Sequence, residues 1–304
     1  MDFNEPDFPG ISADERAAAA ARSTWVSVGV NLALTTGQIV AGVLSRSQGL
    51  VADGVHSLSD LLSDFVVLAA SRQSRKAADA RHPYGHHRFE TAASLALGGL
   101  LLAVGLGMLW SAATRLEQPQ QLHPVGTLAL WAAATALLVK ELLFRYMLAV
   151  ATRLKSSLLT ANAWHARSDA ASSLVVGVGI IGNLAGFHLL DAVAALIVGF
   201  MVTRMGWTFA WDALHDLMDR AADEREVLAI RHTLEQCTGV LGVHDLHTRK
   251  MGDLIAVDAH LEVDGSITVQ AGHAIAVAAR QAVLDRHRVL NVVTHVDPRT
   301  PPAR

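Results

Sequence analysis

Two short segments of the sequence pair an imidazole with a carboxylate at the same spacing. His56 precedes Asp60 by four residues, and His165 precedes Asp169 by four residues. Four residues are about one helical turn, so each pair lies on one face of a helix. Two such helices in contact offer two nitrogens and two oxygens, a tetrahedral set suited to Zn²⁺, and the two carboxylates neutralise the dication.

The segments that contain these pairs are apolar enough to cross a membrane. A helix needs roughly 20 mostly apolar residues to span the hydrocarbon core, and the sequence contains six such runs. Because a soluble helical protein would show polar faces on these segments, we expect a polytopic α-helical membrane domain over residues 23–211, after a tail at residues 1–22. The six predicted spans are residues 25–44, 50–70, 91–114, 124–144, 157–184 and 189–211.

Titratable groups inside these spans need a compensating role, because an aspartate at the centre of a span costs about 2.5–3.5 kcal/mol on insertion scales. At about 100° per residue, Asp53, Asp60 and Asp64 fall within about 40° of one another, and His56 lies beside them. Interhelical salt bridges or hydrogen bonds are the alternative to a metal site, but a repeated His-x-x-x-Asp on two spans favours the metal. Asp53 and Asp64 are expected to line an access path, or only to bond to nearby Ser, Thr or Asn side chains such as Asn162.

Two further features of the spans concern helix packing. Arg167 projects about 200° away from His165 and is expected to face a neighbouring helix or to reach the membrane surface. Gly99, Ala103 and Gly107 form a small-residue face on the third span, which predicts close packing of that helix. Such a face permits the helix movements that alternating access requires.

Basic residues in the connections between the spans predict the orientation, because Lys and Arg are retained on the cytoplasmic side. The connection after the fourth span carries Arg145, Arg153 and Lys155, and the one after the second is also basic, whereas the opposite side carries Arg46 and Arg115. Both termini are therefore expected in the cytoplasm, with the protein in the cytoplasmic (inner) membrane. The N-terminal tail lacks the basic start and apolar core of a signal peptide.

After residue 211 the pattern changes to short alternating runs that are typical of a soluble domain. The order helix, strand, strand, helix, strand indicates a small cytoplasmic α+β domain of ferredoxin-like type over residues 212–298, followed by a tail at residues 299–304. The predicted helices are residues 223–237 and 268–287, and the predicted strands are residues 243–249, 254–263 and 289–296.

Composition excludes several classes of protein. The net charge of −3 gives no reason to expect a nucleic-acid partner. The single cysteine, Cys237, rules out a disulfide framework and any Cys-x-x-Cys site.

The motifs in the spans resemble those of the cation diffusion facilitator family, the six-span divalent-cation/proton exchangers. Residues 49–60, Gly-Leu-Val-Ala-Asp-Gly-Val-His-Ser-Leu-Ser-Asp, match the family's second-span motif, and residues 165–169, His-Ala-Arg-Ser-Asp, match that of the fifth. The resemblance covers about residues 22 to 298. It implies a transport site made of His56, Asp60, His165 and Asp169.

The same resemblance bears on which ion is carried. Members with histidine in the second-span pair tend toward zinc, whereas a manganese member would show Asp-x-x-x-Asp there and asparagine in place of His165. The resemblance therefore implies Zn²⁺, with Cd²⁺, Co²⁺, Fe²⁺ and Mn²⁺ as alternatives.

A histidine-rich connection follows the second span. It contains Asp79, His82 and His86, which a tight turn at Pro83 and Gly85 could gather on one ion. By composition alone, such a basic loop is more typical of a solvated or lipid-headgroup surface. The resemblance implies a metal site instead, because the family's loop site has this Asp-x-x-His-x-x-x-His spacing.

The resemblance implies two more features. Arg88 and Asp219 resemble the charge pair that joins the membrane part of the family to its cytoplasmic domain. Isolated histidines on strands are usually packing or surface residues, but five positions resemble the binuclear metal site at the family's cytoplasmic dimer interface, which also implies a homodimer. These positions are His244, His260, His273, His295 and Asp297.

The expected function is export of a divalent metal cation in exchange for protons by alternating access. Imidazole binds metal only when neutral, and its unperturbed pKa is about 6.5, so metal entry should expel bound protons. Zn²⁺ in the cytoplasmic sites would be structural or regulatory.

No enzyme is expected, because the sequence has no His-Glu-x-x-His and four protein ligands leave no position for a catalytic water. A membrane metal sensor is a further alternative to a transporter, but a sensor does not need paired His-x-x-x-Asp motifs in its spans.

Overall fold

The computed structural model describes residues 13–74, 76–117, 124–154, 157–252 and 254–299. Within the helices, some side chains lie outside the described part, those of Asp64, Asn162 and His165 among them. The described residues divide into two compact units. The first is drawn from Met1–Phe65 and Leu100–Trp207, and the second from Val66–Gly99 and Thr208–Arg304.

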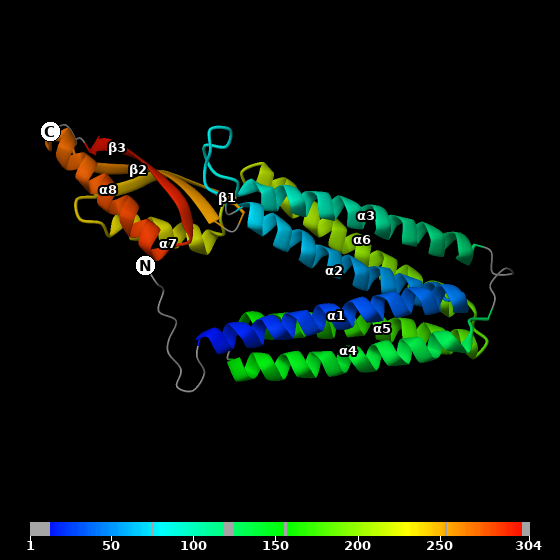
Figure 1. Ribbon diagram of the computed structural model, residues 1–304. Coiled ribbons are helices and arrows are strands. Elements are labelled where there is room, and N and C mark those ends of the chain that lie inside the picture. The colour runs from blue at the N-terminus through cyan, green and yellow to red at the C-terminus, as the bar shows by residue number, and fades with distance from the viewer. Residues whose placement is uncertain (1–12, 75, 118–123, 155–156, 253, 300–304) are drawn as a thin grey trace. The chain divides into compact units, whose positions relative to one another are not determined.

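Six long helices come first in the chain (Figure 1). They are α1 (Ala13–Ser45), α2 (Gln48–Ser74), α3 (Arg88–Leu116), α4 (Thr127–Leu154), α5 (Ser157–Leu184) and α6 (Leu189–Leu217). The shortest has 27 residues, which exceeds the roughly 20 that a membrane span needs. By length and composition, α1, α3, α4 and α6 are apolar enough to cross a membrane. Helices α2 and α5, which carry the histidine–aspartate pairs, have 27 and 28 residues.

Large apolar side chains cover the outside of these helices. Trp110 is 75% exposed, Trp131 is 73% exposed and Leu44 is 70% exposed. In water such a surface would be an association site, whereas in a lipid bilayer it is the expected outer face of a membrane protein. The polar and charged side chains Asp53, His56 and Lys140 are buried instead.

Small and medium-sized side chains form the core of the first unit. Helix α4 packs along α5 and α1, and the three run side by side in Figure 1. Leu50, Val176, Ile180 and Val198 are completely buried there. This core holds the start of α2 against α5 and α6.

An aspartate on α6 fixes the start of α2. The carboxylate of Asp191 accepts a hydrogen bond from the backbone N–H of Gln48 at 2.8 Å and another from the Ser47 hydroxyl at 2.6 Å. Ser47 in turn accepts a hydrogen bond from the backbone N–H of Leu50 at 3.1 Å. The first N–H groups of a helix lack partners within that helix, and these contacts satisfy two of them. The position of α2 along its axis, and hence the depth of its histidine and aspartates, is set here.

Helix α3 packs closely, as predicted, but through glycines other than the predicted Gly99 and Gly107. A methyl group added at Gly99 or Gly107 would meet no described atom within 4 Å. The close approach runs through Gly105 instead, where an added Cβ would lie 2.6 Å from the backbone nitrogen of Thr203 on α6. Gly206 of α6 makes an equally close approach to α3. The glycines on α3 repeat at helical spacing on more than one face, so their spacing alone does not identify the face in contact.

The fourth helix is longer than predicted. Its apolar run ends near residue 144, but α4 continues to Leu154, so Arg145 and Arg153 lie on the helix and not in a connection. Arg145 forms an exposed ion pair with Glu141 one turn earlier, at 2.8 Å. The longer helix places Lys140 midway along α4.

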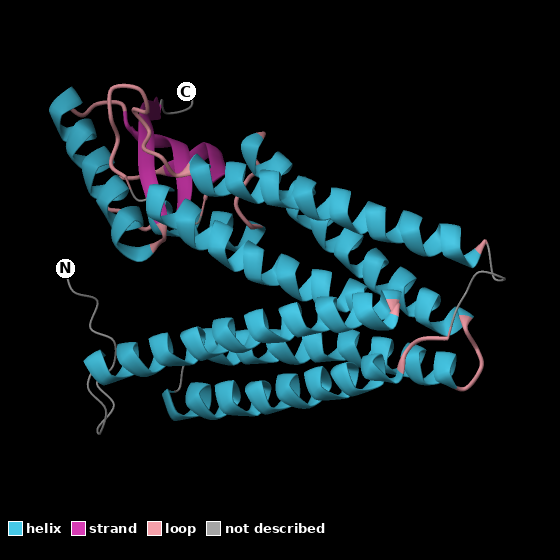
Figure 2. Ribbon diagram, turned by 45° about the vertical axis from the view of Figure 1, so that its right-hand side comes forward, coloured by secondary structure: helices cyan, strands magenta, loops and turns pink. Residues whose placement is uncertain are grey.

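A small α+β domain follows, as the sequence predicts. Its elements are α7 (Glu224–Glu235), β1 (Gly242–Met251), β2 (Leu254–Asp264), α8 (Val269–Arg286) and β3 (Val289–Arg299). The strand order is β1-β2-β3, with β1 antiparallel and β3 parallel to β2. Figure 2 shows the strands gathered in one sheet. The order of elements and the mixed sheet fit the ferredoxin-like class.

The two faces of this sheet differ. Alternate residues of β2, among them Val257, Ala259 and Leu261, are buried against a core that includes Ile230 of α7 and Val283 of α8. Because successive strand residues point to opposite faces, His260 lies on the other face. The helices therefore cover one face and leave the histidine-bearing face open.

The close approach of α3 and α6 predicts the effect of enlarging Gly105. The variant Gly105→Ala should destabilise the protein by about 1–3 kcal/mol, because backbone atoms of α6 occupy the space of the new methyl group. The measurement is thermal unfolding of the purified protein in detergent. Gly107→Ala on the same helix is the matched control, and equal unfolding midpoints for the two variants would contradict the observed contact.

Candidate metal centre

Three of the four residues predicted to hold the transported ion lie together in the structure. His56 and Asp60 are one turn apart on α2, and His56 Nδ1 lies 3.6 Å from Asp60 Oδ2. One ligand atom from each of His56, Asp60 and Asp169 lies within 4.8 Å of the others. The fourth predicted ligand, His165, belongs to α5 one turn before Asp169, and its side chain lies outside the described residues.

The chemistry of this cluster suits a borderline-soft dication. Imidazole nitrogen and carboxylate oxygen bind Zn²⁺ at about 2.0–2.2 Å, so the three side chains would have to close slightly on an ion. His56 is 6% exposed, which keeps water away from one side of the cluster. The two carboxylates supply the charge that a dication requires in a poorly solvated site.

A small cavity opens beside the cluster. Its volume is about 60 Å³, which leaves room for a few water molecules. This space admits a metal ion together with water molecules. Asp60 and Asp169 line it, together with polar and apolar side chains of α1 and α4, among them Thr24, Ser27, Asn31, Leu143 and Met147.

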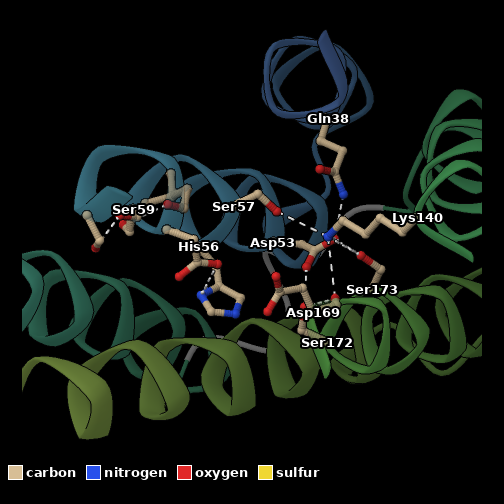
Figure 3. Close-up of polar contacts among 12 residues, drawn as sticks. Gln38, Asp53, His56, Ser57, Ser59, Lys140, Asp169, Ser172 and Ser173 are labelled. Atoms are coloured by element: carbon tan, nitrogen blue, oxygen red, sulfur yellow. Dashed lines mark hydrogen bonds and ion pairs between the residues drawn. The ribbon is translucent and has the colours of Figure 1, made fainter. Parts of the chain in front are cut away.

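The contacts of Asp53 bear on the two roles that the sequence left open for it. Its side chain is fully buried, and its carboxylate accepts hydrogen bonds from Ser172 Oγ at 2.7 Å, from Ser173 Oγ at 2.6 Å and from Gln38 Nε2 (Figure 3). Of the two roles that the sequence left open, the described contacts match bonding to neighbouring side chains. The adjacent serines on α5 supply the donors, and their contribution could not be read from α2 alone. The side chain of Asp64, the other predicted access residue, lies outside the described part.

Lys140 is a buried residue at this site that the sequence analysis did not single out. It is 4% exposed, and its ammonium reaches from α4 toward Asp53, Ser57 and Ser173 in Figure 3. Its charge is the feature of the sequence that could have identified it, because a lysine inside an apolar span is as costly as an aspartate. The sequence placed it near the end of its span, where a lysine can reach the membrane surface.

Arg167 lies where the sequence predicts, against a neighbouring helix. Its guanidinium carbon is 4.7 Å from the centre of the Phe144 ring on α4 and 5.3 Å from that of Trp164. Cation–π contacts of this kind stabilise the arginine in this position.

The loop between α2 and α3 gathers its predicted residues. Asp79 Oδ1 lies 3.3 Å from His82 Nδ1, and Asp79 Oδ2 lies 3.5 Å from His86 Nε2. The turn closes through a hydrogen bond from the backbone N–H of Gly85 to the carbonyl of His82, and Gly85 has a φ of 82° that favours glycine. These three side chains therefore form a compact candidate metal site.

Backbone hydrogen bonds hold the carboxylate of this loop site. The N–H groups of His82 and Arg81 donate to Asp79 Oδ1 at 2.7 and 2.8 Å. They lower the pKa of Asp79 below its ordinary value, with His82 the larger cause. Asp79 thus remains an anionic ligand in mildly acidic solution, and protons compete with metal at the histidines.

Arg88 and Asp219 form the predicted charge pair. The guanidinium of Arg88 bonds to the Asp219 carboxylate and donates to the backbone carbonyl of Leu217 at 3.2 Å. It also lies 3.4 Å from Met251 Sδ at the end of β1. Within the second unit, one side chain at the start of α3 thus connects the end of α6 to the sheet.

Four of the five residues predicted in the C-terminal domain converge on the open face of its sheet. His244, His260 and His295 are direct neighbours across the three strands. The carboxylate of Asp297 lies 3.3 Å from His244 Nε2, 3.0 Å from His260 Nδ1 and 3.2 Å from His295 Nε2. A carboxylate among three imidazoles is a fitting ligand set for a metal ion.

His273 and Asp245 differ from the expected arrangement of this cluster. His273 is exposed on α8, which packs on the opposite face of the sheet, so one copy of the chain does not bring it to the other four residues. Asp245, which the sequence analysis passed over, lies 3.3 Å from His244 through its Oδ2 atom. A register shift follows His244 in β1, and simple alternation could not reveal it.

The described part of the protein therefore holds side-chain clusters that could bind a metal ion inside a group of membrane helices and on an appended α+β domain. Histidine and carboxylate side chains gathered among membrane helices are typical of a membrane transporter of metal cations. Residues 24–218 match the family model of the cation efflux transmembrane domain, and residues 222–299 match that of the cation efflux protein, cytoplasmic domain. The chain belongs to the cation diffusion facilitator family, whose members are transporters and not enzymes.

Curated relatives agree with this assignment. Metal tolerance protein C1 of Arabidopsis thaliana is 33% identical over 88% of this chain, which spans 60% of that longer protein. The manganese efflux system protein MneS of Bacillus subtilis is 31% identical over 90% of this chain and 93% of its own length. Magnetosome protein MamB of a Magnetospira species is 30% identical over 85% of this chain and 88% of its own length.

The C-terminal cluster predicts the effect of removing His260. Loss of an outer-shell partner alone costs about 10–100-fold in metal affinity, so His260→Ala should weaken zinc binding at this cluster at least about tenfold. Isothermal titration of the purified protein measures this in an Asp60→Ala, Asp79→Ala background, where the other candidate sites are disabled. His247→Ala removes an exposed histidine of the same sheet as the control. Equal affinities in the two variants would contradict a metal site at this cluster.

Proposed function

We propose that this protein exports Zn²⁺ from the cytoplasm in exchange for protons. The observation that carries the proposal is the convergence of His56, Asp60 and Asp169 from two membrane helices beside a cavity of about 60 Å³. His165 would complete a tetrahedral set of two nitrogens and two oxygens. Two carboxylates balance the charge of the ion, so the loaded site is neutral inside the membrane.

Protons and metal compete for the same nitrogens in this mechanism. A site open to the cytoplasm binds Zn²⁺ at neutral imidazoles and releases any protons that they held. When the site opens to the other side, protons return to the histidines, weaken the binding of the ion and release it. The proton gradient thereby drives export. This order requires the bundle to expose its centre to one side at a time.

The protein is proposed to act as a homodimer in the cytoplasmic membrane, with both termini in the cytoplasm. The basic connection around residues 76–88 supports this orientation. The match of residues 222–299 to the family's cytoplasmic domain supports the placement of the C-terminal domain. His273 supports the dimer, because a second copy could supply the histidine that α8 holds away from the cluster. Zn²⁺ at the loop and sheet clusters would regulate transport or stabilise the dimer.

Manganese is the second candidate ion. It is favoured by the similarity to a protein named for manganese efflux. Mn²⁺ prefers oxygen ligands, whereas imidazole suits Zn²⁺. The histidine in the α2 pair therefore favours zinc over manganese.

The proposed transport site predicts the loss of flux when either carboxylate is removed. Asp60→Ala or Asp169→Ala should lower the initial rate of Zn²⁺ transport at least about tenfold, because the dication would lack a ligand and half of its compensating charge. The rate is measured with liposomes that contain a zinc indicator and have an imposed pH gradient. Glu141→Ala removes a carboxylate of α4 that is paired with exposed Arg145, and is the control.

Two outcomes of this assay would contradict the proposal. If the carboxylate variants carried Zn²⁺ as fast as Glu141→Ala, the ion would bind elsewhere. If collapse of the pH gradient left the rate unchanged, the exchange would not involve protons. Repeating the assay with Mn²⁺, Cd²⁺, Fe²⁺ and Co²⁺ identifies the preferred ion.

A further inference from the structure

The ammonium group of Lys140 is buried midway along α4 and is held by acceptors on two other helices. Its Nζ atom donates to Ser173 Oγ at 2.7 Å, to Ser57 Oγ at 3.1 Å and to the backbone carbonyl of Asp169 at 3.4 Å. An ammonium has three donors, and each has a partner here. A buried cation with a complete set of acceptors is an ordered part of the structure and not a charge that reaches the membrane surface.

Asp53 compensates the charge of this lysine. Its Oδ2 atom lies 3.8 Å from Lys140 Nζ, and both side chains are almost completely inaccessible. Ser173 bridges the pair, since its hydroxyl donates to Asp53 and accepts from Lys140. A buried ion pair is expensive to desolvate and persists only when further hydrogen bonds satisfy both partners. Those further bonds come from α1, α2 and α5, so the pair is built into the packing of the bundle.

The acceptors of Lys140 are neighbours of the ion ligands. Ser57 follows His56 on α2, and the carbonyl that accepts from Lys140 belongs to Asp169 itself. A single side chain from α4 therefore holds the two ligand-bearing helices to each other at the level of the cluster. Lys140 also lines the cavity beside Asp60 and Asp169. The separation of α2 and α5 sets the distances between ligand atoms, and Lys140 restrains that separation.

The Lys140–Asp53 pair also gives the carboxylates of the site different roles. Asp53, Asp60 and Asp169 carry three negative charges when ionised, and Lys140 carries one positive charge. Because Asp53 is engaged by Lys140, Gln38 and the two serines of α5, it is held away from the ion. Two carboxylates remain for a dication, which is the number that balances its charge.

We propose that Lys140 is a positioning and specificity-determining residue for the transported ion. It fixes the spacing of α2 and α5 and withholds Asp53, so that the ion meets two carboxylates together with imidazole nitrogen and not three carboxylates. This inference rests on the proposed function, because it assumes that the ion binds at His56, Asp60 and Asp169. Without the ammonium, the site would gain an oxygen ligand and lose its fixed spacing. Both changes favour harder and larger ions such as Mn²⁺ over Zn²⁺.

The test separates positioning from simple stability. Lys140→Met leaves Asp53 without its cation, whereas the double variant Lys140→Met/Asp53→Asn removes both charges and leaves no uncompensated carboxylate. Arg145→Met is the matched control, because it removes an exposed cation from the same helix. Full-length protein in liposomes supplies initial rates over a range of Zn²⁺ and Mn²⁺ concentrations, and thermal unfolding in detergent reports on folding.

The expected result is a change in KM and in metal preference. In the folded double variant, the KM for Zn²⁺ should rise about tenfold, which corresponds to about 1.4 kcal/mol, with a smaller change in kcat. In Lys140→Met, the ratio of Zn²⁺ to Mn²⁺ transport should fall, because Asp53 becomes available as an oxygen ligand. A folded double variant with the parental KM and metal ratio overturns the inference.

Two milder variants test the role of Lys140 if the double variant does not fold. Ser57→Ala removes an acceptor of Lys140 on α2, and Ser173→Ala removes one on α5. Each should raise the KM for Zn²⁺ or lower the Zn²⁺ to Mn²⁺ ratio, and parental values in both would overturn the inference. Failure of the proposed function is distinguishable, because then Asp60→Ala would transport Zn²⁺ as fast as the parent. If Asp60→Ala is inactive and the Lys140 variants are unchanged, only the role of Lys140 is wrong.

Discussion

Charge buried within membrane helices must be compensated by other charges and hydrogen bonds, because lipid and packed side chains solvate it poorly. The α2–α5 region meets this requirement in two parts. Asp53 and Lys140 compensate each other and are satisfied by Gln38 and the serines around them. Asp60 and Asp169 line a small cavity beside that pair. The first part is a complete structural unit, and the second is suited to receive a mobile cation.

Much of the fold follows from periodicity and length. Six apolar runs correspond to α1–α6, and the change to alternating patterns after residue 211 corresponds to the α+β domain. The errors occur where helices continue in polar sequence. Helix α4 extends through Arg145 and Arg153, because packing along α1 and α5 and the pairing of Arg145 with Glu141 maintain a helix that hydropathy alone would end. The contact face of α3 could not be predicted from the spacing of its residues, because it depends on where α6 lies.

The candidate sites were predictable to the extent that their residues repeat at regular spacing. His56 and Asp60 share a helix face, which local periodicity predicts. The three histidines of the sheet lie on three strands, so the resemblance to the family was needed to group them. Lys140 could not be linked to Asp53 by periodicity, because they are on different helices and their contact depends on how α2, α4 and α5 pack. The contact of Asp245 with His244 could not be predicted from strand alternation either, because it depends on a bulge in β1. His273 lies on the wrong side of the sheet for a ligand from the same copy, which a count of histidines cannot reveal.

The strand register of the C-terminal domain has a consequence for how its cluster assembles. His244 and His260 meet in the β1–β2 hairpin, whereas His295 and Asp297 arrive only with β3, which reaches β2 through the crossover helix α8. During synthesis the ligands therefore cannot come together until the last strand has docked. Metal that binds all four then favours the docked state by mass action, because it has no equivalent partner in the partly folded chain. The supply of the ion around that domain would thus influence how many newly made chains complete it, before any of them carries an ion.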